Sequence, residues 1–516
     1  MSETNEERRE FTSRTPFNDN PERVVHRRGF VTRHQVSGWR FVMRRIASGV
    51  ALHDTRMLVD PLRTQNRAVL VGALVSATVV AGCFVFSLIR PGGDAGSSTI
   101  LADRDTSALY VRIGDVVHPA LNLTSARLIA GQADNPTTVK SSEIDKFARG
   151  NLIGIPGAPE RMVQNTSREA NWTVCDAVSG GTIGVTLIAG APDQQGERAA
   201  PLPADRAVLV QNVGGVHAGT WLLWNGKRSP IDLGNRAVTA ALGLGNDIPA
   251  PRVIDPGLFN AIPEAAPLLA PVLPGAGEPP RFDLPVPAPV GAVVAAFEAD
   301  NTIRYFAVHA DGLQPISPVL AAILRNSNSY GLQQPPRLGA DEVAKLPVVG
   351  GIDTDAYPAE EITLAEAGPA PVTCAHWSKP ADATESRLSL LTGAALPLTD
   401  GQRTVALVGA GGGATADRVA LPPGSGYFVQ SVGSDAGAPP AGSSFWVSDT
   451  GVRYGVDTSG DAKSVAALGL NPPPLAVPWS VLAQFAPGPT LSKADALVAH
   501  DAVAPVVASG PEGENE

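Results

Sequence analysis

The chain has 516 residues, of which 44% are hydrophobic, 17% charged and 5% aromatic, with a formal net charge of −10. Its 53 glycines and 46 prolines exceed average usage, yet they fall short of the level typical of a low-complexity or disordered chain. The length indicates several core-forming units rather than one, and the negative charge argues against nucleic acid as a partner.

Residues 1–67 form a basic segment with 13 arginines and eight acidic residues, a net charge of +5. Five apolar residues within it follow one another at steps of three and four, which is the spacing of one helix face: Val36, Trp39, Met43, Ile46 and Val50. A basic amphipathic helix of this kind lies on anionic lipid or binds a partner protein. We predict that these five residues form a partner-docking face, with generic anchoring at the membrane surface as the alternative. Pro61 is expected to stop the helix before the next segment.

Residues 68–89 form an apolar stretch of 22 residues without a charge, bracketed by Arg67 and Arg90. At 1.5 Å per residue a helix of this length reaches roughly 33 Å, enough to cross a hydrocarbon core of about 30 Å. A cleaved signal peptide would have a shorter apolar core and fewer residues before it. The sequence around Cys83 resembles a bacterial lipobox, but apolar residues continue beyond it, where a lipoprotein turns polar. We therefore predict a transmembrane helix.

The charges on either side of this stretch differ. Residues 23–67 contain ten arginines and two acidic residues, whereas residues 91–105 contain three aspartates and one arginine. Positively charged flanks remain in the cytoplasm, so we expect a single-pass membrane protein with a cytoplasmic N-terminus and an exported body that starts at residue 90. Subtracting the +5 of residues 1–67 from the −10 of the whole chain leaves −15 for that body.

The exported part contains four loosely similar segments, each with a strand, a glycine-containing turn, a second strand and a helix. They begin at residues 109, 220, 303 and 445, and their turn glycines are Gly114, Gly226, Gly312 and Gly451. Glycine suits such turns because it tolerates positive φ. The turn glycines are 112, 86 and 139 residues apart, too uneven for a solenoid, so we predict small α/β lobes joined by other material.

Between the second and third segments, residues 263–289 contain nine prolines and are expected to form an extended interdomain spacer. Thr182–Gly190 and Thr404–Leu407 read as strands of a central unit between the lobes. The predicted fold is therefore α/β, with α+β lobes. The predicted parts are a cytoplasmic region (1–67), a transmembrane helix (68–89), four lobes (90–155, 206–262, 290–347 and 418–486), a central domain in two parts (156–205 and 348–417), the linker (263–289), and a C-terminal segment with an acidic tail (487–516).

The exported part contains two cysteines, Cys175 and Cys374. Two cysteines in an oxidising compartment favour a disulfide. Metal binding is the alternative, because His376 lies two residues after Cys374, but no further cysteine completes a site. We predict the disulfide.

A search for catalytic motifs finds little. The sequence contains no G-x-x-x-x-G-K-[ST], no G-x-S-x-G and no H-E-x-x-H. The glycine-rich stretch 409–413 lacks the lysine and hydroxyl that hold phosphates and Mg²⁺, and Asp353 with Asp355 reads as a solvated turn. We assign no catalytic, cofactor-binding or metal-binding residue and no cofactor. The sequence is typical of an anchored exported scaffold.

Several blocks, in order along the chain, resemble the EccB family of type VII (ESX) secretion systems of mycobacteria. They include VTRHQVSGWRFVMRRI (31–46), HDTRMLVDPL (53–62), TVKSSEIDKFARGNLIGIPGAPERM (138–162), WTVC (172–175), DTGVRYGV (449–456) and PGPTLSKADALVAHD (487–501). The block HDTRMLVDPL and the block GLQQPPRLGADEVAKLPV (331–348) are most similar to the paralogue of the ESX system tied to iron and zinc acquisition.

This resemblance implies a single-pass inner-membrane component with four repeat lobes around a central β domain, a disulfide at Cys175 and Cys374, and homodimerisation through the periplasmic domain. The implied partners are the EccC motor ATPase, EccD and EccE, and also the mycosin protease. Family members are often called ATPases, although no residue quoted above carries that activity. A periplasmic nucleotide hydrolase and an envelope- or peptidoglycan-binding module therefore remain the alternatives to a structural subunit.

Overall fold

The computed structural model describes residues 32–53, 61–89, 95–179, 183–298, 302–409, 415–459 and 463–501, with backbone alone at 61–64 and 87–89. The chain divides into two compact units, Met1–Pro91 and Gly92–Glu516, and each is considered by itself. The predicted acidic tail, residues 1–31 and most of the glycine-rich stretch 409–413 lie outside the described residues.

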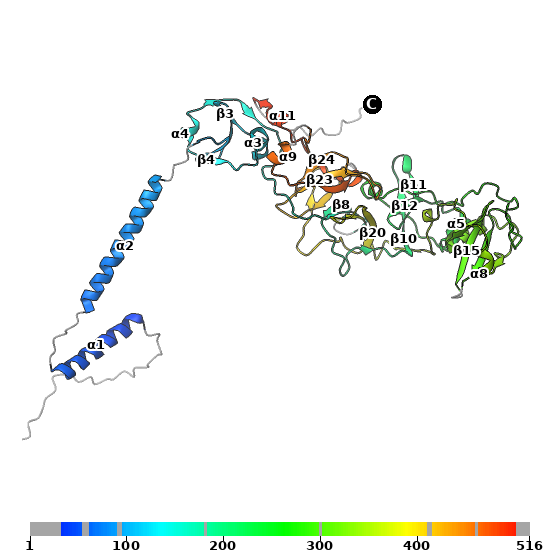
Figure 1. Ribbon diagram of the computed structural model, residues 1–516, viewed down its shortest axis with the longest axis horizontal. Coiled ribbons are helices and arrows are strands. Elements are labelled where there is room, and N and C mark those ends of the chain that lie inside the picture. The colour runs from blue at the N-terminus through cyan, green and yellow to red at the C-terminus, as the bar shows by residue number, and fades with distance from the viewer. Residues whose placement is uncertain are drawn as a thin grey trace, which may run out of the picture. The chain divides into compact units, whose positions relative to one another are not determined.

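The first unit contains two helices, α1 (Arg33–Leu52) and α2 (Pro61–Ile89) (Figure 1). Helix α1 covers the predicted amphipathic stretch, and the Gln35 Oε1 atom accepts the Thr32 backbone N–H at 3.0 Å at its first turn. Helix α2 contains the predicted apolar stretch but begins earlier. Pro61 was expected to stop the amphipathic helix, but α1 already ends at Leu52. Pro61 is instead the first residue of α2, a position where the missing N–H costs no hydrogen bond.

The second unit contains four small sheets of one kind (Figure 1). In each, three consecutive strands form an antiparallel meander, and a later strand that follows a helix pairs in parallel with the first strand of the meander. Sheets 1 and 4 add a parallel strand, β5 or β27, at the opposite edge. The parallel pairing requires a crossover connection, which the helix supplies.

The elements of sheets 1 and 2 are as follows. Sheet 1 has the order β4-β1-β2-β3-β5 and comprises β1 (Ile100–Asp103), β2 (Leu109–Ile113), β3 (Val116–Pro119), β4 (Thr137–Val139) and β5 (Ala148–Arg149), with α3 (Leu123–Ala130) and α4 (Ser141–Ile144). Sheet 2 has the order β12-β11-β10-β13 and comprises β10 (Arg206–Asn212), β11 (Gly219–Trp224), β12 (Lys227–Pro230) and β13 (Arg252–Val253), with η1 (Gly215–His217), α5 (Arg236–Ala241) and α6 (Pro256–Ala261); β18 (Thr363–Leu364) also pairs with β10.

Sheets 3 and 4 follow the same plan. Sheet 3 has the order β16-β15-β14-β17 and comprises β14 (Val293–Phe297), β15 (Ile303–Val308), β16 (Leu313–Ile316) and β17 (Arg337–Leu338), with α7 (Pro318–Ser327), α8 (Ala340–Val343) and η2 (Thr354–Ala356). Sheet 4 has the order β26-β23-β24-β25-β27 and comprises β23 (Tyr427–Val432), β24 (Ser444–Val447), β25 (Val452–Val456), β26 (Leu475–Pro478) and β27 (Ala486–Pro487), with α9 (Lys463–Ala467), α10 (Trp479–Leu482) and α11 (Lys493–Ala496).

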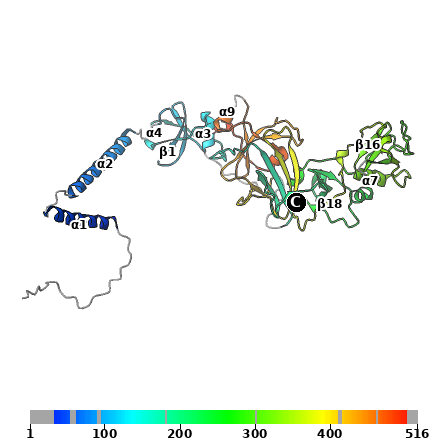
Figure 2. The same cartoon turned by 60° about the horizontal axis from the view of Figure 1, so that its bottom comes forward.

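A seven-stranded central sheet is assembled from distant parts of the chain. Its order is β21-β22-β8-β7-β19-β20-β9, and it comprises β7 (Ala170–Ala177), β8 (Gly184–Ala189), β9 (Ala200–Pro201), β19 (Val372–Lys379), β20 (Arg387–Gly393), β21 (Val405–Ala406) and β22 (Arg418–Ala420). The two eight-residue strands β7 and β19 pair antiparallel along their whole length in the middle of the sheet; long strands of the two parts lie side by side in Figure 2. The strands β6 (Leu152–Ile153) and β28 (Ala499–His500) form a separate pair.

The sheets share hydrophobic cores. One face of the central sheet packs in a single core with α6 and with residues of sheets 2 and 4. Sheets 1 and 4 share a second core, and sheet 2 shares a third with Val319 and Ile323 of helix α7. The central sheet is therefore covered on this face by two of the small sheets, and the other two are attached through them.

Three of the four predicted turn glycines have the positive φ expected of them: 62° at Gly114, 73° at Gly226 and 82° at Gly451. Gly312 has no positive φ, and its role is different. A Cβ atom on Gly312 would lie 2.5 Å from the Pro347 carbonyl oxygen, beside the point where the Leu313 N–H donates to that oxygen at 2.8 Å. Glycine is required there for close backbone approach.

The proline-rich segment 263–289 contains no helix or strand, as expected, but it is more than a spacer. Leu268 is 1% exposed and belongs to the core that sheet 2 shares with α7, whereas Leu273 is 5% exposed and belongs to a core of sheet 3. The segment therefore packs on both sheets, because its leucines supply apolar anchors that the proline content alone did not indicate.

Candidate functional sites: a disulfide-linked sheet and two apolar helices

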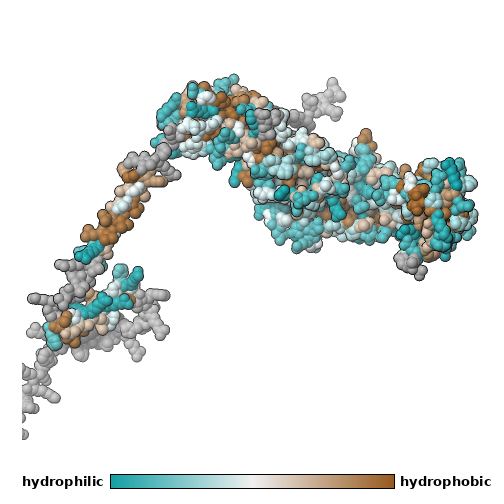
Figure 3. Space-filling model, in the orientation of Figure 1, coloured by the Kyte–Doolittle hydropathy of each residue, from teal (hydrophilic) through white to brown (hydrophobic). Residues whose placement is uncertain are grey.

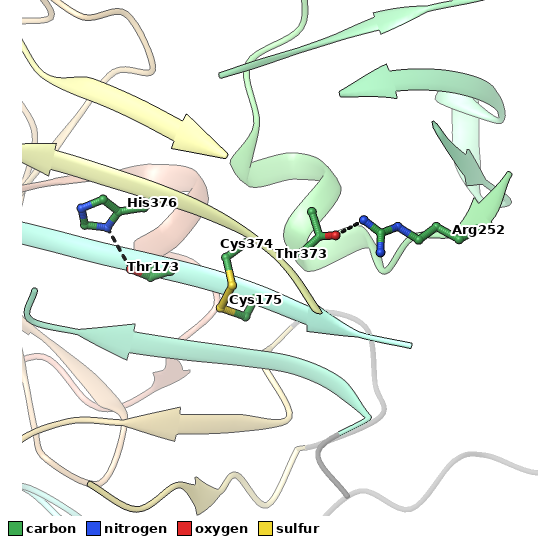
Figure 4. Close-up of a disulfide and its surroundings, with 6 residues drawn as sticks. All are labelled: Thr173, Cys175, Arg252, Thr373, Cys374 and His376. Carbon is green, nitrogen blue, oxygen red and sulfur yellow. Dashed lines mark hydrogen bonds between the residues drawn. A yellow bond between two sulfur atoms is a disulfide. The ribbon is translucent and has the colours of Figure 1, made fainter. Parts of the chain in front are cut away.

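The centre of the body is a disulfide between Cys175 of β7 and Cys374 of β19, as predicted (Figure 4). The two cysteines are directly opposite in the antiparallel register, their Cα atoms are 4.0 Å apart, and both side chains are fully buried. Cross-strand partners that do not exchange backbone hydrogen bonds approach this closely. The bond closes a loop of 199 residues, and sheets 2 and 3 lie wholly within that loop.

The opposite face of the same two strands is aromatic. Trp172 and Trp377 are cross-strand partners, and both are buried. The Trp172 ring meets Tyr427 of β23 edge-on with centroids 5.3 Å apart, and its indole N–H donates to the Ala476 carbonyl of β26 at 2.9 Å. Trp172 therefore fixes sheet 4 on the central sheet through both apolar and polar contacts.

His376 lies on the disulfide face, and its ring has a hydrogen-bond partner within the sheet. Its Nδ1 atom is 2.9 Å from the Thr173 hydroxyl oxygen of the neighbouring strand (Figure 4). Burial lowers the pKa of His376 to about 4, because the charged imidazolium would lose its hydration. The ring is therefore neutral at neutral pH, and the contact to Thr173 is an ordinary hydrogen bond inside the sheet.

Arg252 of β13 connects sheet 2 to the central sheet. Its guanidinium donates to the Thr373 hydroxyl of β19 (Figure 4). It also donates to the Ala370 carbonyl at 3.2 Å. Burial lowers the pKa of Arg252 to about 10, an effect that the charge of Asp176 opposes. Burial likewise raises the pKa of Asp176, whose Oδ2 atom accepts the Asp255 backbone N–H at 2.8 Å.

The gap that Arg252 and Asp176 border has a volume of about 10 Å³, at the lower limit of what one water molecule occupies. It leaves no room for a substrate, so these charged groups attach one sheet to another. Sequence reasoning missed both residues. A lone arginine and a lone aspartate carry no local signal, because what distinguishes them is burial against strands more than 75 residues away in the chain.

The predicted docking residues all lie on α1, and all are exposed within their unit. The exposed fraction is 66% at Trp39, 47% at Met43 and 55% at Ile46. Val42 is also exposed and lies beside Trp39 and Ile46 at helical spacing, so it extends the face. Phe41 lies on the opposite side of the helix by the same spacing. Figure 3 shows α1 with a hydrophilic side and a more hydrophobic side.

Helix α2 carries an apolar surface along its length (Figure 3). The stretch Gln65–Phe86 is 22 residues long, is apolar enough to cross a membrane and has no buried residue. It is the one helix of this kind among the described residues. Leu70 and Leu74 are each about 70% exposed, which is unfavourable in water and favourable in lipid.

The described residues hold no group of three or more His, Cys, Asp or Glu placed to bind a metal. Asp353 accepts the Asp355 backbone N–H at 3.2 Å, within the short helix η2, in agreement with the turn expected there.

Comparison with known proteins decides the family. The family described as "Type VII secretion system ESX-1, transport TM domain B" matches residues 28–505. The chain belongs to the EccB family of type VII secretion proteins. The family resemblance seen in the sequence is thereby confirmed, and relatives of the ESX-3 type support the paralogue.

This EccB chain is 68% identical to the "ESX-3 secretion system ATPase EccB3" of Mycolicibacterium smegmatis, with 96% of each chain covered. It is 64% identical to the protein of the same name in Mycobacterium tuberculosis, with 97% of this chain and 95% of that one covered. Among solved structures, the EccB3 dimer from the ESX-3 core complex is 65% identical with a TM-score of 0.70, and the match covers 78% of this chain and all of that one. A chain of an intact ESX-5 inner membrane complex is 36% identical with a TM-score of 0.71, with 94% and 99% covered.

Proposed function

We propose that this EccB chain is a structural subunit of a type VII secretion complex in the inner membrane, and that it acts there as a homodimer. The observation that carries the proposal is the likeness to the EccB3 dimer from the ESX-3 core complex, at 65% identity over the whole of that chain. Because fold and sequence agree at this level, the same mode of assembly is the simplest expectation.

The proposed topology has α1 in the cytoplasm, α2 across the bilayer and the second unit in the periplasm. The excess of arginine before α2 supports this orientation. The Cys175–Cys374 disulfide supports it independently, since disulfides persist in oxidising compartments and are rare in the cytosol. In this topology the four small sheets are repeat lobes around the central sheet, and the periplasmic body forms the dimer.

The proposed role of α1 is to bind other subunits of the complex. Its exposed apolar face holds Val36, Trp39, Met43, Ile46 and Val50, and no described residue covers it. An apolar helix face of this kind binds a groove on a partner. The partners we propose are the EccC motor ATPase, EccD and EccE, with the mycosin protease as a partner of the periplasmic body.

Affinity purification of the tagged full chain from detergent-solubilised membranes tests this proposal. We expect the motor ATPase and the other membrane subunits to co-purify with a dimer of the chain. The variant Trp39→Ser/Ile46→Ser should lose the cytoplasmic partners while remaining dimeric, and the matched variant Phe41→Ser, on the opposite side of α1, should retain them. Recovery of a lone monomer from the unsubstituted chain would contradict the proposal.

A second candidate function follows from the names of the relatives, which include the word ATPase. An experiment can distinguish nucleotide hydrolysis by this chain from hydrolysis by a motor ATPase bound to it. If the activity belongs to the motor, phosphate release should disappear from preparations of Trp39→Ser/Ile46→Ser that have lost the motor. Turnover that persists at the same rate per EccB chain in those preparations would assign hydrolysis to EccB itself.

A further inference from the structure

A wide groove lies where sheet 4 meets the end of the β7–β19 pair. Its volume is about 670 Å³, within the usual range of ligand sites. Four parts of the chain line it: residues within 164–170 before and at the start of β7, residues within 379–383 at and after the end of β19, Pro440, and residues 471–476 leading into β26. Nothing described so far accounts for it.

The charged residues that line the groove are both cations, although the body as a whole has a strongly negative net charge. Arg168 and Lys379 line it, and no aspartate or glutamate is among the lining residues. Glu169 and Asp382 are close to these cations in sequence, but neither lines the groove. Neither cation forms an ion pair within the described part of the chain. Lys379 is opposite Ala170 in the strand register, so the two cations lie at the same end of the β7–β19 pair.

The walls are held in place before any ligand binds. Gln164 and Asn471 exchange two hydrogen bonds, from the Gln164 amide to the Asn471 carbonyl at 3.0 Å and from the Asn471 N–H to the Gln164 side chain at 2.7 Å. The Asn165 N–H donates to the Gly426 carbonyl at 2.7 Å, which ties the same wall to sheet 4. A preformed site loses little conformational entropy on binding, so Arg168 and Lys379 can bind a ligand at low entropic cost.

The lining also indicates the kind of ligand. Five prolines contribute rigid aliphatic surface, Pro380, Pro440, Pro472, Pro473 and Pro474, and no Trp, Tyr or Phe is among the lining residues. A sugar ring is usually held on an aromatic face, which this groove lacks, whereas an extended peptide packs well on proline and alanine side chains. Carboxylates are the groups that arginine and lysine bind by charge-assisted hydrogen bonds.

We infer that this groove binds an extended acidic peptide segment of another protein chain, with carboxylates held by Arg168 and Lys379. This goes beyond the dimer and the α1 contacts proposed above. It rests on the proposed function only in that a multi-subunit complex supplies such a segment, and binding of a free peptide is measured without that complex.

Fluorescence anisotropy of the full chain in lipid nanodiscs tests the inference, with a fluorescein-labelled peptide of sequence GEPEGE as probe and its glutamine counterpart GQPQGQ as control. We expect the acidic peptide to bind at least about tenfold more tightly, and binding to weaken with added salt as the charges are screened. The Arg168→Gln/Lys379→Gln variant should bind the acidic peptide about tenfold or more weakly than the unsubstituted chain does, because each lost charge-assisted hydrogen bond is worth about a factor of ten.

The matched control is Arg387→Gln/Lys493→Gln, which removes the same charge at two exposed positions outside the groove and should leave the affinity within about twofold. Equal binding of the two peptides, or unchanged binding by the Arg168→Gln/Lys379→Gln variant, would overturn the inference. A chain truncated after residue 501 distinguishes the occupants. Unchanged affinity for the probe supports a segment of another chain, and a marked increase would show that the acidic residues after 501 compete for the groove.

Discussion

Replacing both cysteines of the disulfide by alanine should destabilise the second unit, the body of the molecule, without changing its fold. Cys175 and Cys374 are fully buried in an apolar core, so alanine adds no unpaired hydroxyl there, as serine would. The matched control is Cys83→Ala, which removes the exposed free cysteine of α2 and leaves the disulfide intact.

The size of the effect follows from the loop that the bond closes. For a loop of 199 residues the chain-entropy relation gives about 5 kcal/mol of stabilisation, which is an upper figure. The body has roughly 400 residues, and unfolding entropy of about 2.1 cal/mol/K per residue amounts to about 0.85 kcal/mol/K. The loss therefore lowers the melting temperature by about 6 °C if the body unfolds in one transition.

Thermal unfolding followed by tryptophan fluorescence measures this shift, because Trp172 and Trp377 flank the two cysteines in the sequence. We expect the unsubstituted chain with reductant to melt at the temperature of Cys175→Ala/Cys374→Ala, and reductant to leave that variant and Cys83→Ala unaffected. A double variant that melts with the unsubstituted chain would refute the loop-entropy reasoning. Three free thiols in the exported protein would refute the compartment assignment.

Three further substitutions test the contacts around the central sheet by chemical denaturation. Trp172→Ala should cost about 4 kcal/mol, since it leaves a cavity against Tyr427 and removes the donor to the half-buried Ala476 carbonyl; a loss under 1 kcal/mol would contradict its attachment role. The His376 pKa of about 4 lies below its unfolded value of 6.5, so its stabilising effect is complete above pH 6.5 and is lost as the pH falls toward 4. Because of this group, the free energy of unfolding of the unsubstituted chain should fall by about 2 kcal/mol by pH 5, and His376→Gln should abolish that part of the pH dependence. A pH profile that the substitution leaves unchanged would show that His376 is not the group responsible. Arg252→Met should cost about 2 kcal/mol at pH 7 and less at low pH, where the raised pKa of Asp176 lets that carboxyl become neutral; a pH-independent loss would show that Asp176 does not depend on Arg252.

The parts of the fold that depend on residues close together in the chain were predictable from the sequence. Alternation and turn glycines indicated the strands around Gly114, Gly226 and Gly451, and three- and four-residue steps indicated α1. The disulfide was also predictable, since the two cysteines that follow the apolar stretch leave one pairing.

Long-range features were not predictable in the same way. Nothing local shows that β7 pairs with β19 two hundred residues later, that Arg252 reaches Thr373, or that Leu268 is buried. Gly312 shows the same limit, since the residue was singled out correctly but the reason, close approach to the Pro347 carbonyl, lies in tertiary structure. The groove between β7, β19 and β26 is lined by four segments that are distant in the chain, so no single sequence motif indicates it.

The position of the disulfide has a mechanical consequence. Sheets 2 and 3 form an excursion of the chain that returns to the central sheet at Val372, the first residue of β19. A pull on that excursion peels β19 from β7 starting at this end, one residue pair after another. Only two pairs, Val372 with Ala177 and Thr373 with Asp176, precede the covalent link at Cys374. Separation of the two strands therefore stops after two residue pairs, and beyond that point the force is carried by a sulfur–sulfur bond instead of by hydrogen bonds. Sheets 2 and 3 can thus be pulled without separating β7 from β19 in the central sheet.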